Sequence, residues 1–265
     1  MVSALRNGFH WGKISSRRLA SPTVMVLELH VSDNTFSFQP GQWIDFRVPP
    51  HEWTGGFSPV SLTRELPHLS IAVKHSSRAP PSQWVHSDES AEIGRPVQIR
   101  AGGKCILDKR NLWQQPVVFC AGGIGISPIL SMYRQWVELQ RDLAESKPCA
   151  KGPDASFLYS VSTQQELVFA EEIVEQASLT AHASTTHNVV FTITQQDAWD
   201  DEAQRRWESK GVQCRIGRCM RDFLQLSDPT SAFYICGPPP MLDEAVSLLQ
   251  KRGVDESNIH FERWW

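Results

Sequence analysis

Three glycines that separate an apolar strand from a helix are the residues whose spacing points most clearly to chemistry. The segment reads Val117-Val118-Phe119-Cys120-Ala121-Gly122-Gly123-Ile124-Gly125-Ile126-Ser127-Pro128. Glycines let the backbone turn sharply and approach a ligand without an intervening Cβ. The free N–H groups at the start of the helix offer hydrogen bonds and partial positive charge to an anion. The segment therefore predicts a pyrophosphate site, although an ordinary strand-to-helix turn with Pro128 near the helix start has the same pattern.

A second turn, rich in proline, follows another apolar strand. It reads Phe233-Tyr234-Ile235-Cys236-Gly237-Pro238-Pro239-Pro240-Met241. In open α/β sheets, ligands bind at the carboxyl ends of the strands, where this turn would lie. Its three prolines restrict the backbone before any ligand arrives, so ordering the turn costs little entropy. Cys236 is interpreted either as a thiol that lines this site or as a buried cysteine with a packing role.

The N-terminal part of the chain predicts an all-β domain. Its apolar segments are short and separated by turn residues, at 24–31, 43–48, 69–74 and 97–100, with a further strand from about Lys13. One short helix is expected at about Pro81–Ser87, after two prolines. Short strands with Gly and Pro between them indicate an antiparallel barrel or sandwich.

From Gln115 onward, predicted strands and helices alternate. Strands are expected over 117–120, 157–161, 188–194, 233–236 and 259–261, and helices over 128–145, 169–178, 222–226 and 240–251. This order is typical of βαβ units and a parallel sheet covered on both faces. Trp136, Trp199 and Trp207 are expected to pack from helices. The predicted domains are an N-terminal extension at 1–12, a β domain at 13–112 and an α/β domain at 113–265.

The composition argues against several classes of protein. Among 265 residues, 26 Lys and Arg stand against 29 Asp and Glu, and the formal net charge of −3 gives no electrostatic case for nucleic acid. No apolar run approaches the roughly 18–20 residues of a membrane span. Six cysteines without a C-x-x-C pair indicate a reduced, intracellular protein without an iron–sulfur cluster of its own.

Two further observations concern location and metals. The residues before Glu28 are basic and free of acids, so a short mitochondrial presequence stays open, and we expect either the cytoplasm or the mitochondrion. His182 and His187 lack the spacing of metal ligands on a helix and are expected on a surface loop. No metal site is predicted.

The two turns, in this order and after a β domain, resemble the cofactor motifs of the ferredoxin–NADP reductase superfamily. The pattern is A-G-G-x-G-[IV]-[ST]-P, followed about 110 residues later by C-G-P-P-P-M and then by an aromatic C-terminus. Within the superfamily, Gly55-Gly56-Phe57-Ser58 and Phe261-Glu262-Arg263-Trp264-Trp265 are similar to the oxidoreductase NAD-binding domain-containing proteins of animals. The resemblance covers the chain from about Ile14 to Trp265.

This resemblance implies a fold and an activity. The fold would be a six-stranded antiparallel barrel that binds FAD, followed by a Rossmann-like parallel sheet that binds NAD(P)H. The activity would be that of a flavin-dependent oxidoreductase, in which hydride passes from the nicotinamide to the flavin and electrons then pass to an unidentified acceptor. The alternative is a nucleotide-binding regulatory or interaction protein whose flavin site is degenerate.

The resemblance also assigns residues. By position, Phe57 matches the aromatic residue on the flavin ring, Ser58 the hydroxyl beside flavin N5, and Ser82 the serine on the FAD phosphates. The expected nucleotide loop is Gly122, Gly123, Ile124, Gly125, Ser127 and Pro128, and the turn near the nicotinamide is Cys236, Gly237 and Pro238. Ser58 and Cys236 are the expected catalytic residues. Trp265 is expected over the flavin, and Glu262 is either a proton-transfer residue or a solvated carboxylate.

The sequence departs from the superfamily at the FAD phosphates. Gly55 stands where the superfamily has an arginine that binds the diphosphate, and Phe57 stands where it has a tyrosine. Ala79 replaces a glycine of the phosphate turn, and the two prolines after it have no N–H to donate. Each lost charge-assisted contact costs about 1.5–3 kcal/mol. FAD could still be held through its ring and adenosine, by Arg47, Arg64 or Arg78, or weakly as a substrate.

The choice between NADH and NADPH depends on the end of the second predicted parallel strand. NADP-specific relatives often have an arginine there, whereas this chain has Ser162. Arg218, in a later loop, could supply positive charge. We therefore expect NADH to be favoured over NADPH.

Overall fold

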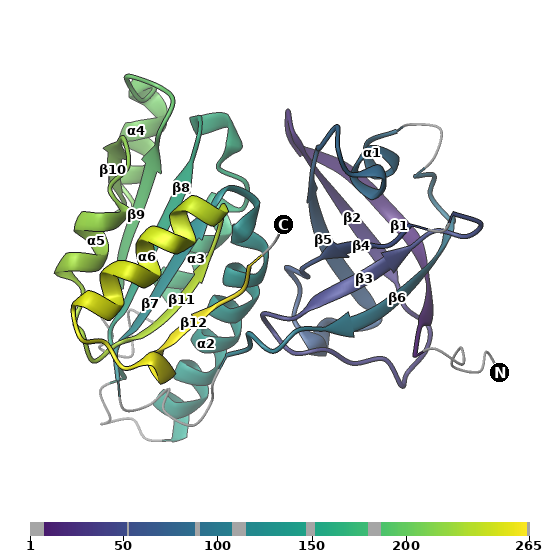
Figure 1. The fold of residues 1–265 in the computed structure, drawn as a ribbon, viewed down its shortest axis with the longest axis horizontal. Helices are drawn as coiled ribbons and strands as arrows, with labels where there is room; N and C mark the ends of the chain where they lie inside the picture. The colour runs from purple at the N-terminus through teal and green to yellow at the C-terminus, as the bar shows by residue number, and fades with distance from the viewer. Residues whose placement is uncertain are drawn as a thin grey trace. The chain divides into compact units, whose positions relative to one another are not determined.

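The computed structural model describes residues 8–51, 53–87, 91–107, 115–146, 152–179 and 187–263. Contacts divide the chain into two compact units, Met1–Leu107 and Asp108–Trp265, each with a hydrophobic core (Figure 1). The domain boundary predicted near residue 112 lies outside the described residues.

The first unit is a six-stranded antiparallel sheet, which confirms the predicted fold class. Its strands are β1 (His10–Ser21), β2 (Val24–His30), β3 (Trp43–Arg47), β4 (Gly55–Phe57), β5 (His68–Lys74) and β6 (Pro96–Gly102). They are ordered β4-β3-β6-β1-β2-β5, and an isolated bridge pairs Pro59, just after β4, with Ile71 of β5. The short helix α1 (Pro80–His86) adds Trp84 and Val85 to the core. β1 begins inside the segment predicted to be an N-terminal extension.

The second unit is a parallel six-stranded sheet covered by helices on both faces (Figure 1). Its strands are β7 (Val117–Gly122), β8 (Ala155–Val161), β9 (His187–Ile193), β10 (Gln213–Ile216), β11 (Ala232–Cys236) and β12 (Ile259–Phe261). The helices are α2 (Ile126–Ser146), α3 (Ala170–Leu179), α4 (Asp201–Glu208), α5 (Met220–Leu226) and α6 (Pro239–Lys251). Apolar residues alternate along the strands between the α2 face and the α5–α6 face.

The order of the parallel strands creates a switch point at β7. The sheet order is β10-β9-β8-β7-β11-β12, so the chain builds one side of β7 first and then crosses to the other side. The loops that leave the carboxyl ends of β7 and β11 therefore run to opposite faces of the sheet. A crevice between such loops is where open α/β sheets bind ligands.

Trp207 lies on a helix, α4, as expected, whereas the bounds of α4 and the strand β10 were not predicted, because neither element has an apolar run. Trp207 is the buried residue of α4, and the helix start depends on Asp200, whose carboxylate accepts hydrogen bonds from the N–H groups of Glu202 and Ala203. β10 is the outer strand, and its Ile216 is 53% exposed. Trp199 packs as expected but lies outside a helix, and its indole N–H donates to the carbonyl of Arg215.

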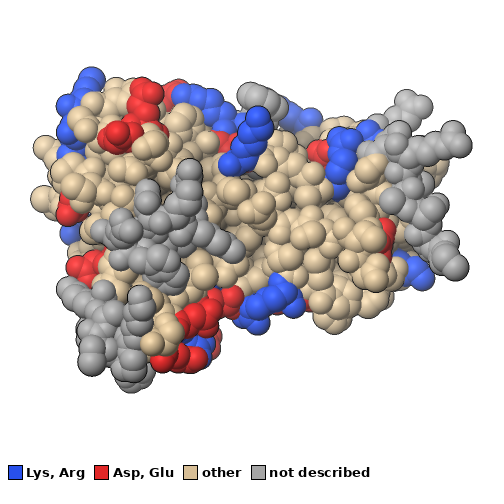
Figure 2. All heavy atoms as spheres, turned by 90° about the horizontal axis from the view of Figure 1, so that it is seen from below, with Lys and Arg blue, Asp and Glu red and all other residues tan. Residues whose placement is uncertain are grey.

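Several general properties follow from the described ranges. None of the described helices is long and apolar enough to cross a bilayer. Within the same ranges, no group of three His, Cys, Asp or Glu side chains could hold a metal ion. The described cysteines are free thiols: Cys105, Cys120, Cys214, Cys219 and Cys236. Figure 2 shows basic and acidic side chains in small groups of both signs on the face in view.

Candidate functional site

The two turns singled out in the sequence leave neighbouring strands of the second unit. β7 and β11 pair in parallel, with Ala121 opposite Cys236, so both turns begin at the same level of the sheet. The first turn continues through a short 3₁₀ segment, Gly123–Gly125, into α2. The second turn enters α6, whose N-cap is Pro238. The fold therefore places both predicted cofactor motifs at the switch point.

The two turns touch through their backbones, and this contact explains three of the glycines. A Cβ on Gly125 would lie 2.4 Å from the carbonyl oxygen of Cys236. A Cβ on Gly122 would lie 2.5 Å from Sδ of Met241, and one on Gly237 would lie 2.8 Å from the same atom. Real Cβ atoms do not approach other atoms so closely, and at Gly125 the blocking atoms are backbone, so this position accepts only glycine, whereas at Gly122 and Gly237 the Met241 side chain would have to move.

Gly123 has a different role from the other glycines of the loop. Its φ of +53° lies in the left-handed region, which side chains other than glycine rarely adopt. A Cβ there would meet no atom within 4 Å. The loop therefore has free space at Gly123, whereas at Gly122 and Gly125 it packs against the second turn.

The start of α2 contains a buried hydroxyl without a partner among the described residues. Ser127 is 2% exposed, and its Oγ makes no hydrogen bond within that part of the chain. Buried polar atoms are nearly always paired, so an unpaired one at a predicted ligand site points to a ligand as its partner. The N-terminal end of α2 also presents positive partial charge. The open glycine loop, the helix start and this hydroxyl fit the pyrophosphate of a dinucleotide.

Replacing Ser127 by Ala is expected to change protein stability and dinucleotide affinity in opposite directions. We expect the free protein to be unchanged or up to about 1 kcal/mol more stable, because an unpaired buried hydroxyl is removed. We expect dinucleotide affinity to fall about tenfold, because the ligand loses a hydrogen bond. Urea unfolding and calorimetric titration with NADH measure the two effects. A loss of stability would show that the hydroxyl has a structural partner in the free protein.

The remaining residues of the two turns lie in the same region. Cys236 is 4% exposed at the end of β11, and Pro128 is buried in the first turn of α2. Ile124 is partly exposed beside Gly123. Ser162 directly follows β8, the strand next to β7.

Arg218 follows β10, at the same carboxyl edge of the sheet but on its outer strand. Three strand spacings separate β10 from β7, which is about 14 Å. Its side chain is exposed and forms no hydrogen bond or ion pair with the described residues. Arg218 therefore lies away from the glycine turns, toward the end of the sheet where the far half of an extended dinucleotide would reach.

The first unit presents Phe57 and Ser58 at the end of β4. The ring of Phe57 is partly exposed and packs against Phe46 with ring centroids 5.7 Å apart. Ser58 is 7% exposed, yet its hydroxyl forms no hydrogen bond with the described residues. An aromatic face beside an unpaired hydroxyl fits a planar heteroaromatic ring with a hydrogen-bonding edge.

Among the described residues around Phe57, the positions expected to bind a diphosphate do not offer a comparable site. A Cβ on Gly55 would lie 2.7 Å from Cβ of Pro81 and 2.9 Å from the Phe57 ring, so an arginine does not fit at position 55. The Ser82 hydroxyl donates to the carbonyl of Lys74 at 2.9 Å and accepts from the N–H of Ser76 at 2.8 Å. This hydroxyl joins β5 to α1 and is already occupied. The residues present fit the ring of FAD and not its diphosphate.

The C-terminal residues are only partly described. Trp265 lies outside the described residues. Glu262 is partly buried, and burial raises its pKa to about 7. This raised pKa distinguishes Glu262 from an ordinary solvated carboxylate.

The expectation that His187 lies on a surface loop is wrong. It is the first residue of β9, and its Nδ1 lies 3.0 Å from the Tyr133 hydroxyl. Burial lowers the pKa of His187 to about 4, so the ring is neutral at pH 7. The Ser/Thr-rich residues before it suggested a loop, but the apolar run that follows makes it a strand start. His182 lies outside the described residues.

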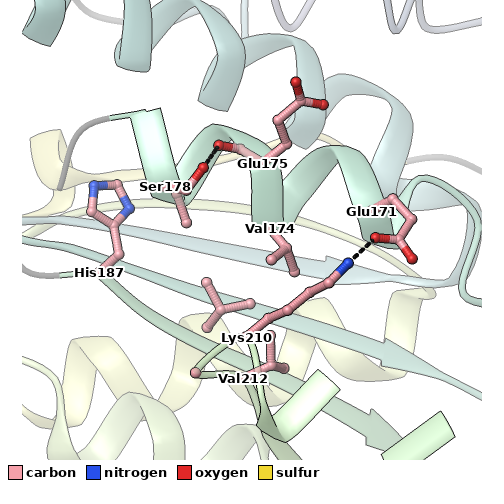
Figure 3. Close-up of a pocket in the computed structure, with 10 residues that line it drawn as sticks. Glu171, Val174, Glu175, Ser178, His187, Lys210 and Val212 are labelled. Atoms are coloured by element: carbon pink, nitrogen blue, oxygen red, sulfur yellow. Dashed lines mark hydrogen bonds and ion pairs between the residues drawn. The ribbon is translucent and has the colours of Figure 1, made fainter. Parts of the chain in front are cut away.

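A pocket of about 600 Å³ lies beside His187 (Figure 3). Val174 from α3 and Val212 before β10 line it, and an ion pair between Lys210 and Glu171 lies at its edge. His187 and Val212 mark the amino ends of β9 and β10, so the pocket is at the opposite edge of the sheet from the glycine turns. The chain between α3 and β9 lies outside the described residues, and we assign no ligand to this pocket.

Known proteins are similar to this chain over most of its length. A family model described as an oxidoreductase NAD-binding domain matches residues 119–247. The chain is 32% identical over 265 residues to oxidoreductase NAD-binding domain-containing protein 1 of Homo sapiens, which covers 96% of this chain and 79% of that protein.

Solved structures with lower identity share the fold. The ferredoxin reductase in carbazole 1,9a-dioxygenase has a TM-score of 0.73 at 16% identity, over 97% of this chain and 69% of its own. A ferredoxin NADP⁺ reductase from Neisseria gonorrhoeae with bound FAD and NADP has a TM-score of 0.70 at 17% identity, over 96% of this chain and 97% of its own. The chain therefore belongs to the family of oxidoreductase NAD-binding domain-containing proteins, and it has the two-domain fold of the ferredoxin reductases.

Proposed function

We propose that this protein is an oxidoreductase that takes electrons from NAD(P)H through a flavin. The observation that carries the proposal is the open glycine loop with the unpaired Ser127 hydroxyl, which suits a pyrophosphate at the switch point of the sheet. The residues Phe57 and Ser58 suit a flavin ring in the first unit. A flavin bound there would supply the atom that accepts hydride from the nicotinamide.

The chain's own residues have separate tasks in this proposal. The N–H groups and Ser127 at the start of α2 bind the pyrophosphate, and the turn from Cys236 to Pro238 positions the nicotinamide. Cys236 suits that place because its small thiol ends a buried strand without a long side chain to block the ring. Holding the nicotinamide in a fixed orientation lowers the barrier to hydride transfer, because its orientational entropy is lost on binding and not in the reaction step.

NADH is the proposed donor, with NADPH less favoured. Ser162 offers a hydroxyl at the end of β8 and no positive charge for a 2′-phosphate. Arg218 is the residue that could contact the phosphate, but its exposed side chain would gain only a screened interaction, roughly 0–1 kcal/mol. The electron acceptor is proposed only as a class: a protein or small molecule outside this chain.

The experiment for this function is anaerobic NADH oxidation by the purified protein with added flavin and ferricyanide, followed at 340 nm. We expect turnover in the wild-type protein. Ser58→Ala should lower kcat about tenfold with little change in NADH affinity, because one hydrogen bond to the flavin edge is lost.

Ser61→Ala is the matched control, since Ser61 is equally buried in the same unit but already accepts a hydrogen bond from the N–H of Ser70. Its kcat should match that of the wild-type protein at a temperature where both are folded. NADH binding without oxidation in the presence of any flavin would overturn the proposal.

The second candidate function is a nucleotide-binding regulatory or interaction protein. The crowding of Gly55 and the occupied Ser82 hydroxyl favour it, because both weaken the expected FAD site. It predicts NADH binding in the second unit with no flavin-dependent oxidation.

A further inference from the structure

The start of α1 is the part of the first unit that lies against β4, since Pro81 fills the space beside Gly55. Any diphosphate joined to a flavin ring at Phe57 through a five-carbon ribityl chain must lie close to this helix start or to the neighbouring strands. The donors available there decide which flavins the protein can distinguish.

The first turn of α1 offers almost no donors to an anion. Pro80 and Pro81 have no N–H. The N–H of Ala79 is directed to the carbonyl of Ser76, and the Ser82 hydroxyl joins Ser76 to Lys74. The N–H of Ser82 is the donor that remains in this turn. A short helix with two prolines at its start is therefore a poor phosphate site.

The two arginines on β3 and β6, the strands next to β4 in the sheet order, already have partners. The Arg47 side chain donates from Nε to the Thr54 hydroxyl at 2.7 Å, and its guanidinium lies 4.3 Å from the centre of the Phe9 ring. The Arg100 guanidinium pairs with Asp45 and also lies 4.6 Å from the centre of the Phe9 ring. Both guanidinium groups are therefore already engaged by partners within the first unit.

From these contacts we infer that the protein takes its flavin as an exchangeable substrate, recognised by the ring and not by the diphosphate. This inference rests on the proposed function. It assigns riboflavin, FMN and FAD to one substrate class. In each turnover NAD(P)H gives up a hydride, the flavin takes up that hydride and one proton from solvent, and NAD(P)⁺ and reduced flavin are released. The reduced flavin then carries its two electrons to an acceptor away from the protein.

The experiment compares the three flavins on one preparation of full-length protein. After gel filtration in the absence of flavin, each flavin is titrated by fluorescence quenching and then used as the sole acceptor in anaerobic NADH oxidation. We expect the three dissociation constants to agree within about tenfold, and each flavin to be reduced in many-fold excess over the protein. FAD that survives gel filtration, or that binds more than 100-fold tighter than riboflavin, would overturn the inference.

Two variants separate recognition of the ring from recognition of phosphate. Phe57→Leu keeps an apolar contact with Phe46 and should weaken all three flavins by the same factor, about tenfold, because stacking is lost. Arg78→Ala removes the exposed arginine that precedes α1, and it should leave the ratio of FAD to riboflavin affinity within threefold of the wild-type value. A selective loss of FAD affinity in Arg78→Ala would reveal a phosphate contact and contradict the inference.

The outcomes also separate this inference from the proposed function. Tight FAD that is reduced by NADH overturns the exchangeable substrate and leaves the oxidoreductase standing. Failure of NADH to reduce any of the three flavins, with NADH binding intact, overturns both.

Discussion

Gly125→Ala is expected to lower NADH affinity by about 100-fold, which corresponds to roughly 2.7 kcal/mol. The new Cβ would lie 2.4 Å from the carbonyl oxygen of Cys236 and 2.6 Å from its carbon, so the two turns must separate. The atoms that block the Cβ belong to the backbone of β11 and cannot rotate away. Overpacking of this kind also costs about 3 kcal/mol of unfolding free energy. Calorimetric titration with NADH and urea unfolding measure the two effects.

Gly253→Ala is the matched control for this substitution. Gly253 follows α6 in the same unit, with φ of +75° and no atom within 4 Å of an added Cβ. We expect a loss of about 1 kcal/mol from backbone strain alone and no change in NADH affinity. Wild-type affinity in Gly125→Ala would mean that the contact between the turns does not shape the binding site.

The second large effect is a loss of stability in acid that depends on His187. Burial lowers the pKa of this residue to about 4 in the folded protein, whereas a histidine in the unfolded chain has a pKa of about 6.5. Between these two values the unfolded state binds more protons than the folded state, so stability falls as the pH falls. The contribution is fully present above pH 6.5 and is lost toward pH 4, by about 3 kcal/mol in total.

Urea unfolding at several pH values between 7 and 4 measures this loss, with His187→Gln as the test variant. Glutamine can keep a hydrogen bond to the Tyr133 hydroxyl without titrating, so its stability should depend less on pH over this window. His68→Gln removes an exposed histidine from the first unit and should follow the wild-type curve. Parallel curves for His187→Gln and the wild-type protein would contradict the assignment.

The β-rich half and the alternating half were predictable because their core strands carry apolar runs. Val117–Gly122 and Ala232–Cys236 are buried throughout, and their patterns gave strands close to the observed bounds. The outer strand β10 was missed, and α4 was expected only through Trp207, because both elements bury little apolar surface. Periodicity reports burial, so elements at the edge of a sheet leave a weak signal.

The candidate site was predictable only where the residue type itself implies a structural role, as it does for glycine. The glycine turns were predicted to let the backbone approach a ligand, and the structure shows a different close approach, between Gly125 and the backbone of Cys236. Resemblance identified Ser82 as a phosphate residue, but the sequence could not show that its hydroxyl is shared between Lys74 and Ser76. The role of His187 depended on Tyr133, which lies 54 residues earlier in the chain.

The contact between the two glycine turns involves other residues than those expected to select NADH over NADPH. A Cβ on Gly125 would meet backbone atoms of Cys236 and Gly237, so no side chain takes part in this contact. Substitutions at Ser162 or Arg218 could therefore change which dinucleotide is preferred without moving the two turns. A change of preference from NADH to NADPH would require new positive charge at the carboxyl edge of the sheet and no change in the turns. Few substitutions separate the two preferences.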